Sequence, residues 1–149
     1  IDIRNQTFSL KVLPLICYEI IYSGKIFDNN NFDLIINISE DGWFGKSIGP
    51  KQHFTHSIFR AIESGKYIVR SSNNGIAAII NPLGIVEKKV NFGKSGYIDF
   101  TESLEIQPTV FSKLGNKVFG LLILLYIFFI FSISFMLSFK RNNLRFKNK

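Results

Sequence analysis

The sequence predicts an α/β domain with a mixed sheet, followed by one transmembrane helix. Three patterns in the 149 residues indicate this fold class. Short apolar runs at residues 11–16 and 33–38 have strand length and flank a stretch with helical character. An Asn-Asn-Gly turn joins later apolar runs. Residues 118–139 are predominantly apolar and contain no charged residue, Asn, Gln or Pro. Buried strands joined through helices favour parallel pairing, and strands joined by tight turns favour antiparallel pairing.

The first elements are predicted as a strand, a short helix and a second strand. Residues 1–10 alternate weakly and predict a hairpin strand that leads into the buried strand at 11–16. Residues 19–30 predict a short helix that ends at a run of asparagines, and residues 33–38 predict the second buried strand. Two buried strands with a helix between them indicate a parallel β-α-β unit.

The carboxyl ends of these two strands define the expected site. Neighbouring strands of an open α/β sheet share one crevice at these ends. Cys17 follows the first strand, and the loop at 39–45 follows the second. We therefore expect Cys17 and the segment Asp41–Trp43 to lie at the same edge of the sheet.

Cys17 and Trp43 each allow a functional and a structural interpretation. A cysteine at a strand end is well placed to be a nucleophile, but most free cysteines are small buried hydrophobes. Trp43, the single tryptophan, lies in a glycine-flanked loop, where it forms either a wall of a substrate cleft or a lid over the core.

The second half of the domain is predicted to contain a helix and several short strands. Residues 50–66 carry apolar side chains three and four positions apart, which predicts an amphipathic helix. His53 and His56 on this helix have no third ligand nearby in the sequence, so we expect surface or capping histidines rather than a metal site. Four strands are then expected: two joined through Asn73-Asn74-Gly75 within residues 67–80, one at 85–90 and one at 96–100.

Charge and cysteine content exclude several classes of protein. The net charge is +7, but five positive charges lie in the last ten residues, so the rest of the chain is nearly neutral. A nucleic-acid-binding domain needs a basic face on its folded part, so we expect no nucleic-acid partner. A single cysteine excludes an internal disulfide and a cysteine-rich zinc site.

Residues 118–139 predict a transmembrane helix. These 22 residues would span about 33 Å as a helix, enough for a hydrocarbon core of about 30 Å. Five Lys and Arg residues follow the span. The positive-inside rule therefore predicts a basic cytoplasmic tail at 140–149 and a domain on the opposite side, which is the periplasm in a bacterium.

Several motifs together resemble a known family. Cys17-Tyr18-Glu19 after a buried strand, Trp43-Phe44-Gly45 in the next loop and Arg70–Gly75 are similar to the carbon–nitrogen hydrolase (nitrilase) superfamily. Asp41–Gly45, Ser47–Pro50, Gln52-His53 and the closing apolar helix resemble, more narrowly, the apolipoprotein N-acyltransferase family. The resemblance extends from about Leu10 to the tail. It implies the C-terminal part of a nitrilase-like αββα layered domain with a mixed sheet.

The resemblance also implies an activity. Members of this family work in the bacterial inner membrane and move a fatty acyl chain from a phospholipid to the N-terminal diacylglyceryl-cysteine of an apolipoprotein. Cys17 matches the nucleophile that carries the acyl group as a thioester. Tyr18 and Glu19 match supporting neighbours, and Trp43 is expected to line the acyl or acceptor cleft. No cofactor and no metal are implied.

The family's catalytic Glu and Lys have no counterpart upstream of Cys17. The only charged residues before it are Asp2, Arg4 and Lys11, and none has a matching context. We therefore expect an incomplete enzyme that is inactive alone and needs the N-terminal part of the same enzyme as a partner. Two alternatives remain: a membrane-tethered carbon–nitrogen hydrolase of the amidase type, and an inactive remnant of a split gene.

The expected domain organisation has three parts. Residues 1–112 form the C-terminal part of a nitrilase-like catalytic domain, residues 118–139 form the transmembrane helix, and residues 140–149 form the basic cytoplasmic tail.

Overall fold

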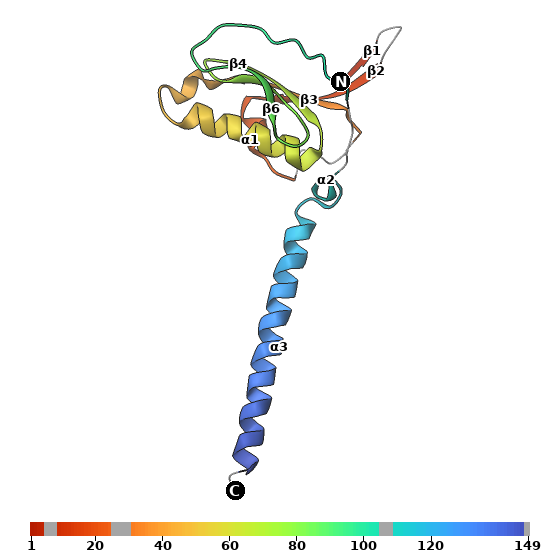
Figure 1. Cartoon of the computed structure of the whole chain (residues 1–149), viewed down its shortest axis with the longest axis vertical. Helices are drawn as coiled ribbons and strands as arrows, with labels where there is room; N and C mark the ends of the chain where they lie inside the picture. Colours follow the sequence, from red (N-terminus) through yellow and green to blue (C-terminus); the bar gives the residue numbers. More distant parts are fainter. Residues whose placement is uncertain (5–8, 25–30, 105–108, 148–149) are drawn as a thin grey trace. The chain divides into compact units, whose positions relative to one another are not determined.

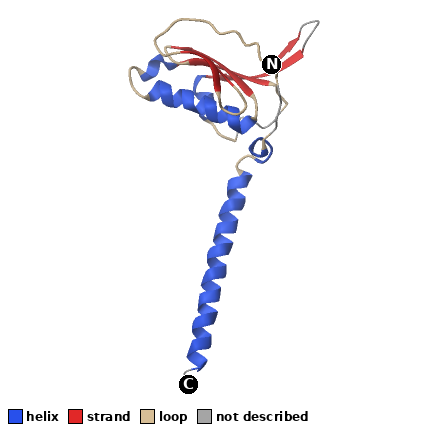
Figure 2. Cartoon of the chain, in the orientation of Figure 1, coloured by secondary structure: helices blue, strands red, loops and turns tan. Residues whose placement is uncertain are grey.

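A computed structural model describes residues 1–4, 9–24, 31–104 and 109–147 of the chain (Figure 1). It contains two compact units, Ile1–Gly115 and Asn116–Lys149. The first unit is a single sheet with helices (Figure 2), and the second is a long helix.

The sheet has six strands in the order β1-β2-β3-β4-β5-β6, which is also their order in the sequence. Strands β2, β3 and β4 pair in parallel, whereas β1, β5 and β6 pair antiparallel with their neighbours. The predicted mixed sheet is therefore confirmed. The strands are β1 (Asp2–Arg4), β2 (Ser9–Ile16), β3 (Leu34–Glu40), β4 (Tyr67–Asn73), β5 (Ala77–Ile80) and β6 (Val86–Val90).

Helix α1 (Gly49–Ser64) connects β3 to β4 and covers one face of the sheet (Figure 1). It begins with Pro50 in its first turn and ends at Gly65, whose φ of 66° terminates the helix in the left-handed region. A short helix, α2 (Val110–Leu114), starts at the N-cap Thr109, whose hydroxyl also bonds the Glu63 carbonyl of α1.

The core lies between α1 and the strands β2 to β5 of the sheet. Most of its buried members come from alternate positions of the strands and from α1, and two come from η1 and from the segment before β3. They are Leu15, Ile20, Phe32, Ile35, Ala61, Ile68, Ala78 and Ile80.

Only part of the helix predicted at 19–30 lies within the described residues. Residues 25–30 lie outside them. The preceding stretch forms a 3₁₀ helix, η1 (Cys17–Ile21), that ends before Tyr22. Tyr22, the residue after η1, has extended dihedral angles and ends the helical stretch. The β2–β3 pairing is nevertheless parallel, as the prediction of a β-α-β unit requires.

The prediction of a strand at 96–100 is wrong. These residues form no strand, and Tyr97 is 89% exposed, so no burial favours their pairing with the sheet edge. The ring of Phe100 instead packs edge-on against Tyr67, with 5.4 Å between ring centroids. Ile68 is in the core with Ala61 of α1, and its neighbour Tyr67 points to the other face of the sheet. Because Phe100 packs on Tyr67, the segment at 96–100 crosses the face opposite to α1 (Figure 1).

Helix α3 (Lys117–Lys147) forms the second unit. Among the described residues it is the one helix long and apolar enough to cross a membrane, over the 23 residues Lys117–Phe139. Its apolar side chains are not buried against other residues. A soluble protein would not leave such a surface in water, so α3 indicates that the chain associates with a membrane.

Candidate active site

Cys17 lies at the point where β2 turns into η1. Its φ of 48° places it in the left-handed region, which only one other non-glycine residue, Asn74, adopts in the described part of the chain. Non-glycine residues in this region are strained by about 1–3 kcal/mol, and such residues cluster at functional sites. A sharp strand-to-helix turn also holds a nucleophile rigidly at the sheet edge. The Cys17 side chain is a free thiol and is partly exposed.

Glu19 stabilises the turn that carries Cys17. Its carboxylate oxygen Oε2 accepts a hydrogen bond of 2.6 Å from the backbone N–H of Ile16, immediately before the cysteine. This contact agrees with a supporting role for Glu19, which stays a prediction. Because this carboxylate is engaged in the turn, it is poorly placed to act as a free general base.

Tyr18 and Trp43 present aromatic surface near the same edge. Tyr18 is 54% exposed, and its ring lies 6.2 Å from that of His53. Trp43 lies on the 3₁₀ helix η2 (Asp41–Phe44) after β3 and is 88% exposed. Trp43 is therefore not a lid over the core. Its expected role in a substrate cleft stays a prediction.

Asp41 is the centre of a buried polar network directly beside Cys17. The side chain is fully buried, and its Oδ1 atom accepts hydrogen bonds from Ser39 (2.7 Å) and Arg70 (3.0 Å) and lies 2.8 Å from Nδ1 of His53. The Oδ2 atom accepts a second bond from Arg70 at 2.8 Å. An isolated carboxylate would be very unfavourable here, so these partners keep it ionised.

The electrostatics of Asp41 make it an anchor rather than a base. Burial is the largest influence and raises the pKa of Asp41. Hydrogen bonds from His53 and Ser39, with the charge of Arg70, outweigh burial and hold the pKa well below its ordinary value of 3.8. A carboxylate that binds protons so weakly does not accept one from a thiol at neutral pH.

Arg70 extends the network across the strands. Residues Asn37 and Arg70 are register partners in β3 and β4, and Nη1 of Arg70 donates to Oδ1 of Asn37. The same nitrogen lies 3.4 Å from the Ser57 hydroxyl on α1. Burial lowers the pKa of Arg70 and the charge of Asp41 opposes this effect.

His53 belongs to this network, and the prediction of a surface or capping histidine is wrong for it. The residue is 3% exposed, because the helix position that it occupies faces the sheet. Its Nε2 atom lies 3.2 Å from the carbonyl oxygen of Cys17. The Ser39 hydroxyl, another member, lies 3.8 Å from the Cys17 sulfur. The structure thus brings Cys17 and the Asp41 loop together, as the strand order predicts.

The sequence contains a signal for this network that apolar periodicity does not reveal. Asn37 interrupts the apolar run of β3, and Arg70 directly follows the apolar residues of β4; both side chains are buried. Buried polar and charged groups require partners. Arg70 pairs in register with Asn37, and the acids Glu40 and Asp41 follow at the carboxyl end of β3; in the structure Asp41 is the acid that pairs with Arg70.

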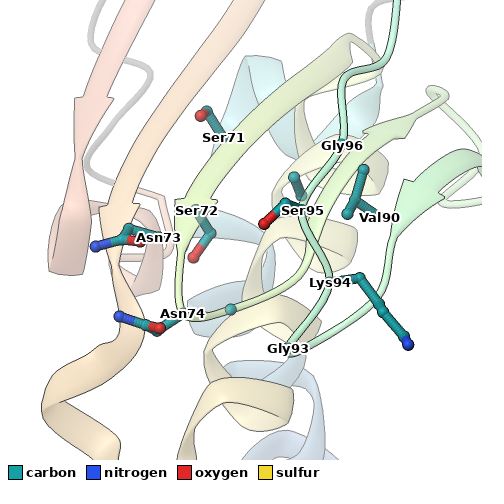
Figure 3. A pocket seen from close by; sticks show the side chains of 11 residues that line it. Ser71, Ser72, Asn73, Asn74, Val90, Gly93, Lys94, Ser95 and Gly96 are labelled. Atoms are coloured by element: carbon teal, nitrogen blue, oxygen red, sulfur yellow. The ribbon is translucent and has the colours of Figure 1, made fainter.

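Two cavities lie near the edge that carries Cys17. A cavity of about 360 Å³ is lined by Ser71–Gly75 at the end of β4 and by Gly93–Gly96 of the following segment (Figure 3). The Ser72 hydroxyl there is buried without a hydrogen-bond partner. A second cavity of about 350 Å³ is lined by residues that include Tyr18, Phe44 and His53. In the described part of the chain, no three His, Cys, Asp or Glu side chains converge as a metal ion would require.

Gly75 is packed directly against the network, which gives a testable prediction. A Cβ atom at this position would overlap the Asp41 carboxylate and the Ser72 hydroxyl. We expect Gly75→Ala to lower the free energy of unfolding by about 1–3 kcal/mol, as overpacking of a core does. Urea unfolding followed by circular dichroism measures this change. The matched control is Gly96→Ala, whose Cβ would meet only the Val90 side chain at 3.3 Å; equal losses in the two variants would contradict the prediction.

Comparison with known proteins defines the class. The model of the carbon–nitrogen hydrolase family matches residues 4–105, so the chain belongs to this family. Within the matched region lie β2 with Cys17, the Asp41 loop, α1 and β4, which are the elements that build the site.

Individual relatives are more specific. The chain is 47% identical over 140 residues to the apolipoprotein N-acyltransferase of Rickettsia bellii, a match that covers 93% of this chain and 27% of the relative. It is 44% identical over 135 residues to that of Rickettsia prowazekii (89% and 26%) and 40% identical over 114 residues to that of Bradyrhizobium diazoefficiens (76% and 21%). The chain thus spans about a quarter of the length of these relatives.

Proposed function

We propose that this chain is the nucleophile-bearing part of a membrane N-acyltransferase that completes the maturation of lipoproteins. The proposal is carried by one observation: a strained cysteine at the carboxyl end of β2, in a chain that resembles apolipoprotein N-acyltransferases over most of its length. The donor is a phospholipid, and the acceptor is the N-terminal diacylglyceryl-cysteine of an apolipoprotein.

The reaction has two half-steps. In the first, the Cys17 thiolate attacks the ester carbonyl of the phospholipid, a C–S bond forms, the C–O bond to glycerol breaks, and lysophospholipid leaves with a proton. In the second, the neutral amine of the acceptor attacks the thioester, an amide bond forms, the C–S bond breaks, and the proton that the amine loses goes to the sulfur, which regenerates the thiol. The thiol proton that Cys17 loses returns to the leaving glycerol oxygen, so each half-step is balanced.

Both half-steps need a base and an oxyanion stabiliser. Asp41 and Glu19 are engaged in the contacts described above, so neither takes the role of base. The family resemblance assigns these roles to a Glu and a Lys that precede the nucleophile, and we propose that the N-terminal part of the same enzyme supplies them. Tyr18 and Trp43 then contribute apolar surface to the substrate cleft, and the chain by itself is inactive.

A segment exchange tests this function. The matching quarter of the Rickettsia bellii relative is replaced by this chain, and the chimera is incubated with a phospholipid that carries a radiolabelled acyl chain. We expect a hydroxylamine-sensitive thioester on the chimera and transfer to an apolipoprotein peptide, both lost in Cys17→Ala. A chimera that is folded and membrane-inserted but forms no thioester would refute the proposal.

An amidase-type activity is the alternative, because the matching family model is that of carbon–nitrogen hydrolases. The same chimera and a panel of small amides distinguish the two. Ammonia release without acylation of the peptide would favour hydrolysis. Lack of both activities in a folded chimera would favour an inactive remnant.

We also propose an orientation for the chain in the bacterial inner membrane. Residues 1–112, the catalytic part, lie in the periplasm, residues 118–139 span the membrane, and residues 140–149 lie in the cytoplasm. The basis is the cluster Lys140, Arg141, Arg145, Lys147 and Lys149 after the span.

Thiol labelling tests this orientation, because Cys17 is the single cysteine. In intact spheroplasts, a membrane-impermeant maleimide is expected to label Cys17. The control chain carries Cys17→Ala with Asn142→Cys and is expected to react only after the membrane is permeabilised. The reverse pattern would overturn the proposed orientation.

A further inference from the structure

The backbone carbonyl of Cys17 is held by two side chains from different elements. His53 Nε2 on α1 lies 3.2 Å from this oxygen, and Nδ2 of Asn37 on β3 donates to it at 3.5 Å. The carbonyl belongs to the residue whose φ is 48°. Contacts from both the helix and the sheet therefore act on the strained residue itself.

The orientation of the His53 ring is fixed on its other side. Nδ1 lies 2.8 Å from Oδ1 of Asp41 and 3.2 Å from Nη2 of Arg70. The rings of Tyr18 and Phe44 flank the imidazole, with centroids at 6.2 and 5.5 Å. The Cys17 carbonyl oxygen and the Asp41 carboxylate oxygen both only accept hydrogen bonds, so the two contacts together require a proton on each ring nitrogen of His53.

The burial of the Asp41–Arg70 pair gives this arrangement its rigidity. Both side chains are fully buried, and they join β4 to the loop after β3. A buried ion pair with further hydrogen bonds has one well-defined geometry. The position of the imidazole is thus determined by a part of the molecule that does not contact the thiol.

We propose that His53 is a positioning residue for Cys17: the Asp41–Arg70 pair orients its ring, and its Nε2–H holds the Cys17 carbonyl so that the thiol stays at the carboxyl end of β2. This inference rests on the proposed function, in which Cys17 is the nucleophile. His53 itself exchanges no proton with the substrate. Its effect is on the placement of the sulfur, which lies 3.8 Å from the Ser39 hydroxyl.

The single cysteine makes a direct test possible. When the full chain is labelled with ¹³C,¹⁵N-cysteine and placed in detergent micelles, all labelled resonances come from Cys17. Their chemical shifts report the backbone conformation of this residue. In the unmodified chain we expect shifts typical of a left-handed residue. Separate labelling with ¹⁵N-histidine is expected to show a protonated Nε2 on His53.

Two amide variants separate the contact to Cys17 from the contact to Asp41. His53→Asn places its amide near the position of Nδ1, so it can contact Asp41 but does not reach the Cys17 carbonyl. His53→Gln is one methylene longer and reaches the position of Nε2. We expect the Cys17 resonances to leave the left-handed range in His53→Asn and to remain there in His53→Gln. His56→Asn, the same change at the neighbouring histidine, is expected to leave them unmoved.

The activity readout uses the chimera described above. We expect His53→Asn to lower kcat about tenfold or more with little change in KM, since small displacements of a reacting group have large effects on rate. His53→Gln is expected to restore most of kcat.

The outcomes distinguish the two proposals. Cys17 shifts that are the same in His53→Asn and in the unmodified chain, or an unprotonated Nε2, would overturn the positioning role even if the chimera acylates its substrate. If the shifts change as expected and the folded chimera forms no thioester, the positioning contact stands and the proposed function fails. Should His53→Asn not fold, the protonation of Nε2 in the unmodified chain decides alone.

Discussion

Replacing Asp41 by asparagine is expected to lower the free energy of unfolding by about 3–5 kcal/mol. The change removes the charge that balances Arg70, and the guanidinium has no access to water because its side chain is fully buried. Removal of one partner of a buried pair leaves the other uncompensated, which is more costly than loss of the pair. Urea unfolding of the full chain in micelles, followed by circular dichroism, measures the difference.

An exposed acid provides the matched control. Asp99 lies at the surface of the segment that follows β6, and Asp99→Asn makes the same chemical change there. Substitutions at such positions usually change stability by less than about 0.5 kcal/mol. An Asp41→Asn chain that is as stable as the Asp99→Asn chain would show that Asp41 does not balance Arg70.

The pH dependence of the stability contributed by the Asp41–Arg70 pair provides a second measurement. The pKa of Asp41 is depressed on folding, so its contribution is complete above the ordinary value of 3.8 and is lost as pH falls below it. The loss is expected to reach about 1.4 kcal/mol per pH unit. The stability difference between the unmodified chain and Asp41→Asn should therefore be constant between about pH 5 and 7 and narrow below about pH 4.

Two arginines in α3 are expected to release the chain from the membrane. Residues 118–139 contain sixteen Val, Leu, Ile and Phe side chains, which together favour insertion by about 5–10 kcal/mol. An arginine near the centre of a span opposes insertion by about 2.5–3.5 kcal/mol, and the replaced apolar residue no longer contributes. Leu124→Arg with Phe128→Arg should thus cancel most of the driving force.

Carbonate extraction of bacterial membranes measures this effect. The unmodified chain is expected to stay in the pellet, and the double-arginine chain is expected to be extracted. The control, Leu124→Ala with Phe128→Ala, keeps the span uncharged and should remain in the pellet. Extraction of the unmodified chain would refute a spanning role for α3.

The sheet could be predicted from the sequence because its signals are local. The apolar runs around Leu15 and Ile35 have strand length, and the turn at Asn74 fixes the antiparallel partner of β4. The segment at 96–100 has a similar apolar character but lies on the sheet face instead of the sheet edge. Periodicity does not distinguish these two placements, because Ile98 and Phe100 alternate with more exposed residues and are half-buried without any strand pairing.

The site could be predicted only in part. The position of Cys17 follows from the end of β2, and its proximity to the Asp41 loop follows from parallel pairing. The role of His53 does not, because it depends on which side of α1 faces the sheet and on a contact 36 residues away in sequence. Helical spacing indicates the apolar side of α1, but it does not show that a polar residue on that side is buried with partners.

The alternation of polar residues along β3 also bears on how the chain folds correctly. Asn37 and Ser39 of β3 lie on the side that faces α1, and Asp41 follows directly after the strand. A slip of one residue in the β3–β4 pairing would move Asn37 and Ser39 to the other face and displace Asp41 from Arg70. Arg70 would then be buried without an acid. A misaligned chain therefore loses both the Asp41–Arg70 ion pair and the contact by which His53 holds the Cys17 carbonyl. The correct β3–β4 register and the position of the Cys17 thiol thus depend on the same contacts. A molecule with a shifted register would not have its nucleophile in place.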